Sequence, residues 1–240
     1  NNRDWPYNNQ YFWRPQAAAG RWMWLLKDMD HGFGYKVSYN YNSLVRHALK
    51  DDLFPHFLDN PEFRSSFINR FTFLMNTLFQ PDHVKELISS VKSRIEPLVP
   101  RHLQRWAGVE TFDNPPTTID EWHAYCDELY QFADNRLPAL RKQLKDQFGL
   151  GDPVEVSINI ESPDMGMLHI ENQPLPSSPW VGTFFSGTLL TLEATPHHGY
   201  KFTGWKGFAS DEDSVAIVPD GDMAITATFD PMNSHGVGVV

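Results

Sequence analysis

The chain has 240 residues, with 30 acidic and 20 basic side chains and a formal net charge of −10. Its 8 Trp, 8 Tyr and 17 Phe residues supply enough apolar material for folded cores, which excludes a wholly disordered chain. It contains no run of roughly 18 apolar residues, so we expect no membrane span. The single cysteine, Cys126, excludes an internal disulfide and a cysteine-based zinc site, and we expect a buried, inert thiol there.

The negative charge is confined to the C-terminal part of the chain. Residues 1–151 contain 18 acidic and 18 basic side chains, whereas residues 152–240 contain 12 acidic side chains and two lysines. Such a step indicates two domains. We therefore expect one domain over residues 1–151, a second over residues 152–231 and a tail over residues 232–240. The acidic second domain is unsuited to nucleic acid, whose phosphates it would repel.

The first domain is predicted to begin with a β-hairpin and to continue as helices. Aromatic, strand-like runs at residues 11–14 and 21–26 flank a loop that contains Pro and Gly. From residue 41 the apolar spacing becomes helical. Helices are predicted over residues 43–50, 61–78 and 81–106, the last interrupted at Pro97 and Pro100, and from a capping box at residues 118–121 to Phe148, with a kink expected at Pro138.

After Pro153 the apolar spacing changes to a period of two. Alternating runs at residues 154–160, 187–194 and 223–229 are separated by short segments rich in turn residues. This pattern predicts a small β-sandwich or barrel of about 75 residues. The expected fold class is therefore α+β, with a mostly helical domain behind a short N-terminal hairpin and then a small all-β, sandwich-like domain.

Polar residues near the N-terminal end have the spacing of a phosphoryl-transfer site. Asp4 is followed five positions later by Asn9, and Asp28 and Asp30 come directly after the second strand-like run. Phosphoryl transfer needs a carboxylate near the attacking hydroxyl and hard oxygen ligands for Mg²⁺. Protein kinases use an Asp and an Asn five residues apart and a further Asp after a hairpin. The spacing fits that arrangement, but Asp and Asn are also common in ordinary loops and turns.

The sequence around these residues resembles a known family. The string from Asn2 to Arg14, which includes Asp4-Trp5-Pro6 and Asn8-Asn9, resembles the catalytic loop of the CotH family, the spore-coat and secretory-pathway kinases of atypical kinase fold. Residues 21–34 resemble the next motif of that family, and residues 60–64 and 94–106 resemble its C-terminal helices. The resemblance covers about residues 1–150 and implies a domain similar to a kinase C lobe.

The resemblance to the CotH family implies a site and a reaction. Asp4 would be the catalytic carboxylate, Asn9 and Asp28 would be metal ligands, and Asp30 would be a further candidate ligand. His31, beside Asp30, would either line the phosphate site or cap the turn. The family implies Mg²⁺ or Mn²⁺, ATP as the phosphoryl donor, and Ser/Thr hydroxyls of secreted or coat proteins as substrates. The implied location is extracellular or at a bacterial cell surface.

A kinase also needs an N-terminal lobe with a phosphate-binding loop and a Lys–Glu pair. No sequence precedes Asn1, and no glycine-rich loop lies elsewhere in the chain, so we expect the C-terminal part of a larger protein that is inactive by itself. The alternative is a non-catalytic surface or scaffold protein that keeps a kinase-like shell. The sequence does not indicate an oligomeric state.

The second domain resembles bacterial surface repeats of the internalin B-repeat type. The phrases at residues 187–196, 199–205 and 225–229 carry this resemblance, which extends over about residues 154–230. It implies an extracellular spacer or adhesion module without catalysis. We expect Trp205 in the core and Trp180 at the surface, and we interpret Asp211-Glu212-Asp213 as a solvated acidic turn in preference to a Ca²⁺ site.

Overall fold

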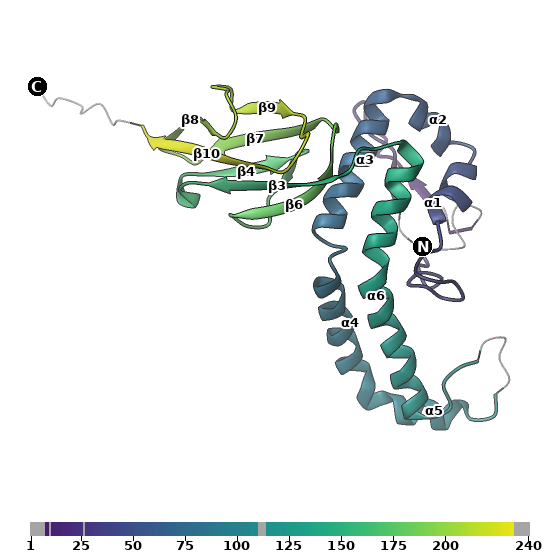
Figure 1. Ribbon diagram of the computed structural model, residues 1–240. Helices are drawn as coiled ribbons and strands as arrows, with labels where there is room; N and C mark the ends of the chain where they lie inside the picture. Colours follow the sequence, from purple (N-terminus) through teal and green to yellow (C-terminus); the bar gives the residue numbers. More distant parts are fainter. Residues whose placement is uncertain (1–7, 10, 26, 110–113, 233–240) are drawn as a thin grey trace, which may run out of the picture. The chain divides into compact units, whose positions relative to one another are not determined.

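The computed structural model describes residues 8–9, 11–25, 27–109 and 114–232. Helices occupy residues 43–148, strands occupy residues 153–231, and a hairpin precedes both (Figure 1), so the predicted α+β class is confirmed. The chain forms two compact units that are not contiguous in sequence. The first comprises residues 1–60 and 78–143, and the second comprises residues 61–77 and 144–240. The domain boundaries at residues 151 and 231 remain a prediction.

The first unit begins with the predicted hairpin, in which β1 (Tyr11–Trp13) and β2 (Met23–Leu25) pair antiparallel. Two short helical segments follow, α1 (Ser43–Arg46), capped by the Asn42 side chain, and the 3-10 helix η1 (Ala48–Lys50). Helix α2 (Phe54–Asp59) was not predicted. It has only six residues, and its cap lies outside it, because the Asp51 carboxylate accepts hydrogen bonds from the backbone N–H groups of Leu53 and Phe54.

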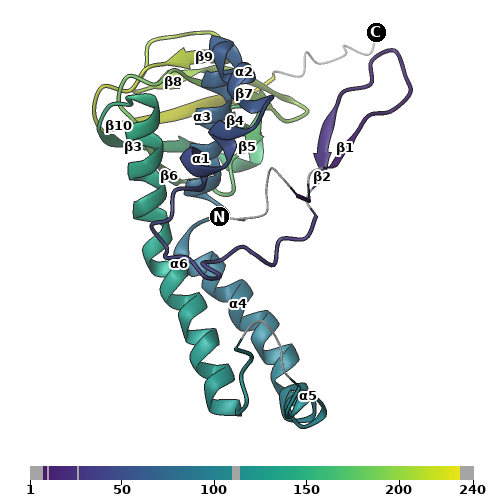
Figure 2. The ribbon, with the colours of Figure 1, turned by 90° about the vertical axis from the view of Figure 1, so that its right-hand side faces the viewer.

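The remaining helices of this unit are α4 (Pro81–Ile95), the 3-10 helix η2 (Glu96–Leu98), α5 (Val99–Trp106) and α6 (Ile119–Phe148). Pro138 lies inside α6 without ending it. Helices α4 and α6 lie side by side in both views (Figures 1 and 2). Lys85 Nζ donates to Asp134 Oδ1 at 2.7 Å, and the side chains of Glu96 and His123 are 2.6 Å apart. The first of these contacts joins α4 to α6, and the second joins η2, directly after α4, to α6.

Two predictions about side chains in α6 are confirmed. The Thr118 hydroxyl accepts a hydrogen bond from the Glu121 backbone N–H at 3.2 Å, as a helix cap does. The Glu121 carboxylate accepts from the backbone N–H of Thr117, and this bond lowers the pKa of that carboxyl. Cys126 is buried, and burial raises the pKa of its thiol. Within the described residues, no helix combines the length and apolar character needed to cross a membrane.

The second unit contains a β-sandwich of two four-stranded sheets, with strand orders β6-β3-β10-β8 and β5-β4-β7-β9. Strands β3 and β10 pair in parallel, and the other pairs are antiparallel. The strands are β3 (Pro153–Ile160), β4 (Gly166–Ile170), β5 (Gln173–Pro174), β6 (Trp180–Phe185), β7 (Leu190–Pro196), β8 (Tyr200–Lys206), β9 (Ser214–Ile217) and β10 (Met223–Pro231), with the 3-10 helix η3 (Pro163–Met165) before β4.

The core of the sandwich lies between the two sheets. Alternate residues of the strands point into it, as the period of two predicts, and Val156 and Ile158 are fully buried. Trp205 is 9% exposed, so its predicted core position is confirmed. The prediction that Trp180 is exposed was wrong. It is 7% exposed because its ring packs against Phe73 and Phe184, with centroids 6.2 and 6.1 Å away.

Helix α3 (Pro61–Asn76) belongs to the same compact unit as the sandwich, together with the last turn of α6. Its buried side chains include Ile68, Asn69, Phe73 and Asn76, and Phe73 is part of the core cluster of the sandwich. A helix that lies some 80 residues before the first strand of the sandwich in sequence therefore contributes to its core.

Candidate functional site

The N-terminal hairpin brings two of the predicted metal ligands to one of its ends. Tyr11 pairs with Leu25, so the chain that enters β1 and the chain that leaves β2 lie at the same end of the hairpin. Asn9 lies two residues before Tyr11, and Asp28 lies three residues after Leu25. Lys27 Nζ donates a hydrogen bond to the Tyr11 hydroxyl at 2.7 Å and joins these two segments. The strand pairing thus places the segments that carry Asn9 and Asp28, which are 19 positions apart in sequence, at the same end of the hairpin.

Both of these residues have a left-handed backbone, with φ of 59° at Asn9 and 52° at Asp28. Among the described residues, six non-glycine positions have a positive φ, and four of them lie between residues 9 and 36. Asn and Asp adopt this conformation at a lower cost than other residues with side chains. Unusual backbone conformations of this kind concentrate at functional sites, where the surrounding structure holds them.

The polar atoms of these residues have different surroundings. The Asn9 amide nitrogen is buried and makes no hydrogen bond within the described part of the chain. Asp28 and Asp30 are exposed, and Asp30 Oδ1 accepts a hydrogen bond from the His31 backbone N–H at 3.0 Å. The His31 ring stacks on Tyr35, with centroids 5.0 Å apart. Asp30 therefore stabilises the turn while it keeps its second carboxylate oxygen for other contacts.

The loop after Asp30 packs closely on helix α6. Gly34 has a φ of +83°, and a Cβ atom at this position would lie 2.7 Å from the ring of Phe132. The ring of the preceding residue, Phe33, packs against the same ring, with centroids 5.5 Å apart. Only glycine satisfies both the backbone angle and the close approach. This contact anchors the segment that carries Asp28 and Asp30 to a long, well-formed helix.

Two further side chains of α6 bind the backbone beyond this loop. The Arg136 guanidinium donates to the carbonyl oxygens of Tyr39 and Tyr41, the latter at 3.0 Å, and Gln143 donates to the carbonyl of Asn40 at 2.7 Å. Burial lowers the pKa of Arg136 to about 10, so the group remains charged at neutral pH. No local pattern in the sequence predicts these contacts, since the partners lie about 100 residues apart.

The donor chemistry of the site fits a divalent metal ion. Asn9, Asp28 and Asp30 offer amide and carboxylate oxygens, the hard ligands that Mg²⁺ and Mn²⁺ take in proteins. In the described part of the chain, no three His, Cys, Asp or Glu side chains are arranged to hold a metal ion. Asp4 lies outside the described residues, so its catalytic role stays a prediction, as does the assignment of the three ligands.

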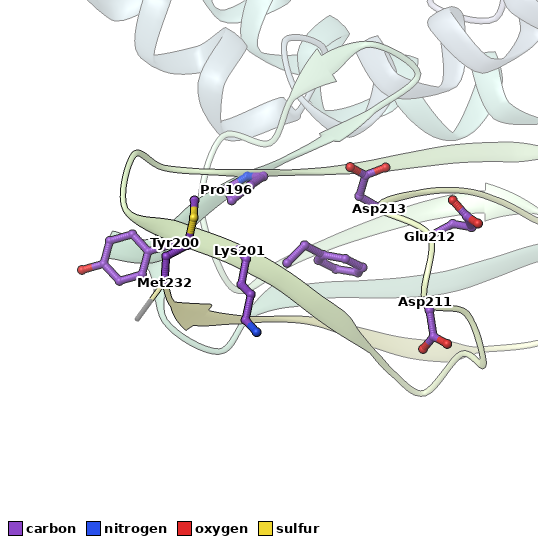
Figure 3. Close-up of a pocket in the computed structure, with 8 residues that line it drawn as sticks. Pro196, Tyr200, Lys201, Asp211, Glu212, Asp213 and Met232 are labelled. Atoms are coloured by element: carbon purple, nitrogen blue, oxygen red, sulfur yellow. The ribbon is translucent and has the colours of Figure 1, made fainter. Parts of the chain in front are cut away.

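A shallow pocket lies on the β-sandwich, beside β8 (Figure 3). Its lining residues are Pro196, Tyr200, Lys201, Phe202, Asp211, Glu212, Asp213 and Met232. The backbone of the acidic loop is held by hydrogen bonds, because the Glu212 carbonyl accepts from Trp205 Nε1 at 2.9 Å and the Asp213 carbonyl accepts from the Ala194 N–H at 2.8 Å. The three acidic side chains are exposed, in agreement with a solvated acidic turn.

Two known protein families match different parts of the chain. Residues 1–140 match the CotH kinase protein family, and residues 180–233 match the divergent InlB B-repeat domain. No curated protein and no solved structure matches the chain. The first match covers more than half of the chain and includes all four predicted site residues, whereas the second begins at β6 and leaves out β3, β4 and β5. The chain therefore belongs to the CotH kinase family, with a divergent InlB B-repeat domain following its CotH region.

Proposed function

We propose that this chain carries the catalytic-loop and metal-binding part of a CotH-type protein kinase. The reaction is transfer of the γ-phosphoryl group of ATP to a Ser or Thr hydroxyl of a secreted or coat protein. Asp4 is the catalytic carboxylate, Asn9 and Asp28 are metal ligands, and Asp30 is a further ligand. The main support is that the hairpin brings Asn9 and Asp28 to one end, each with a left-handed backbone, inside the CotH match.

The proposed reaction assigns a separate task to each of these residues. The acceptor hydroxyl oxygen forms a bond to the γ-phosphorus, the bond from that phosphorus to the bridging oxygen of ADP breaks, and Asp4 accepts the hydroxyl proton. The oxygens of Asn9, Asp28 and Asp30 hold Mg²⁺ or Mn²⁺, which, when bound, neutralises phosphate charge. Since such catalysis depends on positioning, the packing of Gly34 on Phe132 contributes by fixing the loop of Asp28.

The match to the InlB B-repeat domain supports a bacterial extracellular or cell-surface location for this kinase. It also favours a second candidate function, a non-catalytic surface scaffold that retains the kinase-like shell. Both candidates share the fold and the location. They differ in whether Asp28 and its neighbours bind a metal ion and support phosphoryl transfer, and one experiment separates them.

The experiment measures phosphate incorporation from radiolabelled ATP by the full-length protein, with Mg²⁺ or Mn²⁺, into its own hydroxyls and an added acceptor protein. We expect Asp28→Ala to lower the rate at least about 100-fold, because the carboxylate acts on charge that develops in the transition state. The matched control is Asp127→Ala, which removes an exposed carboxylate from α6 and leaves the rate unchanged. Binding of Mn²⁺, followed by electron paramagnetic resonance, should weaken in the first variant only.

Equal turnover by the parent protein and Asp28→Ala would remove Asp28 from the mechanism. Absence of both Mn²⁺ binding and phosphate incorporation in the full-length protein would overturn the kinase proposal and favour the scaffold. Metal binding without phosphate incorporation into any acceptor would leave a metal site but contradict the proposed activity.

A further inference from the structure

Helix α3 binds the edge of the β-sandwich in the way that a neighbouring strand would. Strand β6 is at the edge of its sheet, so one side of its backbone has no strand partner. The Asn76 side chain occupies that side. Its Nδ2 donates to the carbonyl oxygen of Thr183 at 2.8 Å, and its Oδ1 accepts from the backbone N–H of Thr183 at 3.0 Å. One asparagine thus satisfies both backbone groups of an edge-strand residue.

Other side chains on the same face of α3 also contact the sandwich. Asn69 Nδ2 donates to the carbonyl oxygen of Leu189 at 2.8 Å, and Phe73 packs against Trp180. Asn69 and Asn76 are only 3% and 7% exposed. Buried asparagines are uncommon in helices and require hydrogen-bond partners. The sandwich supplies Thr183 as partner for both side-chain groups of Asn76 and supplies an acceptor for Asn69 Nδ2, whereas Asn69 Oδ1 has no partner among the described residues.

The end of the last helix and the start of the connection to the sandwich make several close contacts within the second unit. Leu144 is 1% exposed, and Phe148 packs against Phe67 of α3. A Cβ atom on Gly151 would lie 2.3 Å from the carbonyl oxygen of Ser186, and the Ser186 N–H donates to the carbonyl oxygen of Asp152 at 2.8 Å. A flexible linker has no such contacts, so this connection holds the sandwich in a fixed position on α3.

We propose that the repeat domain is a fixed partner of helix α3, which lies inside the CotH region, and that residues 61–77 and 144–231 unfold as one cooperative unit. This differs from the spacer module that the family resemblance implies. The physical reason is that separation would expose Phe73 and Trp180 to water and would leave Asn69, Asn76 and the Thr183 backbone without their partners. The proposal is independent of any catalytic activity.

The experiment is hydrogen exchange, followed by mass spectrometry, on the full chain and its Asn76→Ala variant. We expect exchange to become about tenfold faster or more in peptides from both α3 and β6, by the same factor, because both report the opening of one unit. Peptides from α4 should exchange at the parent rate. Asn135→Ala provides a matched control, since Asn135 is an exposed asparagine of α6 whose amide donates to the carbonyl of Gln131 in the same helix.

The alternative is that α3 folds with the other helices and only touches the sandwich. In that case Asn76→Ala would accelerate exchange in α3 and α4 together and leave β6 at the parent rate, which would overturn the proposal. Should Asn76→Ala fail to fold, Asn69→Ala serves as the milder variant, because it loses one hydrogen bond to the sandwich where Asn76→Ala loses two. The same joint response of α3 and β6 is required of it.

Discussion

The N-terminal hairpin and the C-terminal sandwich are both β-structure rich in aromatic residues, but the hairpin exposes its aromatic side chains and the sandwich buries many of them. All six residues of β1 and β2 are exposed, whereas the strands of the sandwich bury alternate side chains. Trp22, beside the hairpin strands, is 66% exposed, and Trp180, in the sandwich, is 7% exposed. A sheet buries its aromatic residues only where a second layer covers it, and for Trp180 that layer includes helix α3.

Asparagine side chains show the same contrast. Asn76 is buried and bound to both backbone groups of Thr183, so it acts as a structural residue. Asn9, next to the hairpin, has an amide nitrogen without a hydrogen-bond partner in the described part of the chain, and its backbone is left-handed. The two asparagines thus differ in what the described structure supplies to them: the Asn76 side chain has partners for both its nitrogen and its oxygen, whereas the Asn9 nitrogen has none among the described residues.

The comparison is tested most severely by removing one tryptophan from each region. Trp180→Ala should lower the free energy of unfolding of the second unit by about 3–5 kcal/mol, because a large buried ring leaves a cavity. Trp22→Ala should cost less than about 1 kcal/mol, since it loses mainly a contact with the Arg14 guanidinium. Urea unfolding followed by circular dichroism measures both. Equal losses would mean that the hairpin is covered by another layer.

A second test concerns the loop after Asp30. This loop packs against Phe132 of α6, whereas the residues of the hairpin strands beside it are exposed. Gly34→Ala should destabilise the first unit by about 2 kcal/mol or more, since it combines a left-handed backbone with a close approach to Phe132. Gly108→Ala isolates the backbone contribution, because Gly108 has a φ of +76° and no atom within 4 Å of its Cβ position. It should cost about 1 kcal/mol in the same urea experiment. Identical losses would show that Phe132 does not constrain the loop.

The smallest expected effect is on the ion pair between Lys145 and Asp152, at the junction of α6 and β3. The hydrogen bond from Lys145 holds the pKa of Asp152 below its ordinary value of 3.8. An acid whose pKa is lower in the folded state stabilises the fold above its ordinary pKa and loses that contribution as the pH falls through the folded value.

Asp152→Asn should therefore lower the melting temperature slightly at pH 7 and by less at about pH 3, because the ion pair loses its contribution as the aspartate of the parent protein is protonated. Thermal unfolding at the two pH values measures this difference, and the shift at pH 7 should be smaller than either change above. A decrease of the same size at both pH values would show that the substitution acts through packing and not through charge.

The sequence predicts most helices and strands correctly, but it does not predict which of them pack against each other. The hairpin, the long helices and the alternating strands follow from local spacing, and the capping residues Asn42 and Thr118 do what their positions predict. Helix α2 was missed because a six-residue helix provides too few residues for a periodic signal. The burial of Trp180 was missed because Phe73, which covers it, lies more than 100 positions earlier in the chain.

The candidate site was predictable only in part, for the same reason. The spacing of Asn9, Asp28 and Asp30 can be read directly from the sequence. The aromatic runs between Asn9 and Asp28 predict the hairpin that joins them. The residues that hold the loop, Phe132 and Arg136, lie on an ordinary amphipathic helix. Nothing in one sequence distinguishes them from other residues of α6, because their partners are defined only by tertiary packing.

The parallel pairing of β3 and β10, the first and last strands of the sandwich, has a mechanical consequence. Because the two strands run in the same direction, the chain enters the sandwich at one end and leaves it at the other, on the order of 30 Å away at about 3.3 Å per residue. Tension applied through these two points would slide β3 along β10. The hydrogen bonds along the five paired positions, from Val156–Met223 to Ile160–Ala227, would then carry the load together and would not open one by one. Pulling on the two ends of the module would therefore load these bonds in shear, which predicts a higher resistance to extension than for a pair of strands opened from one end.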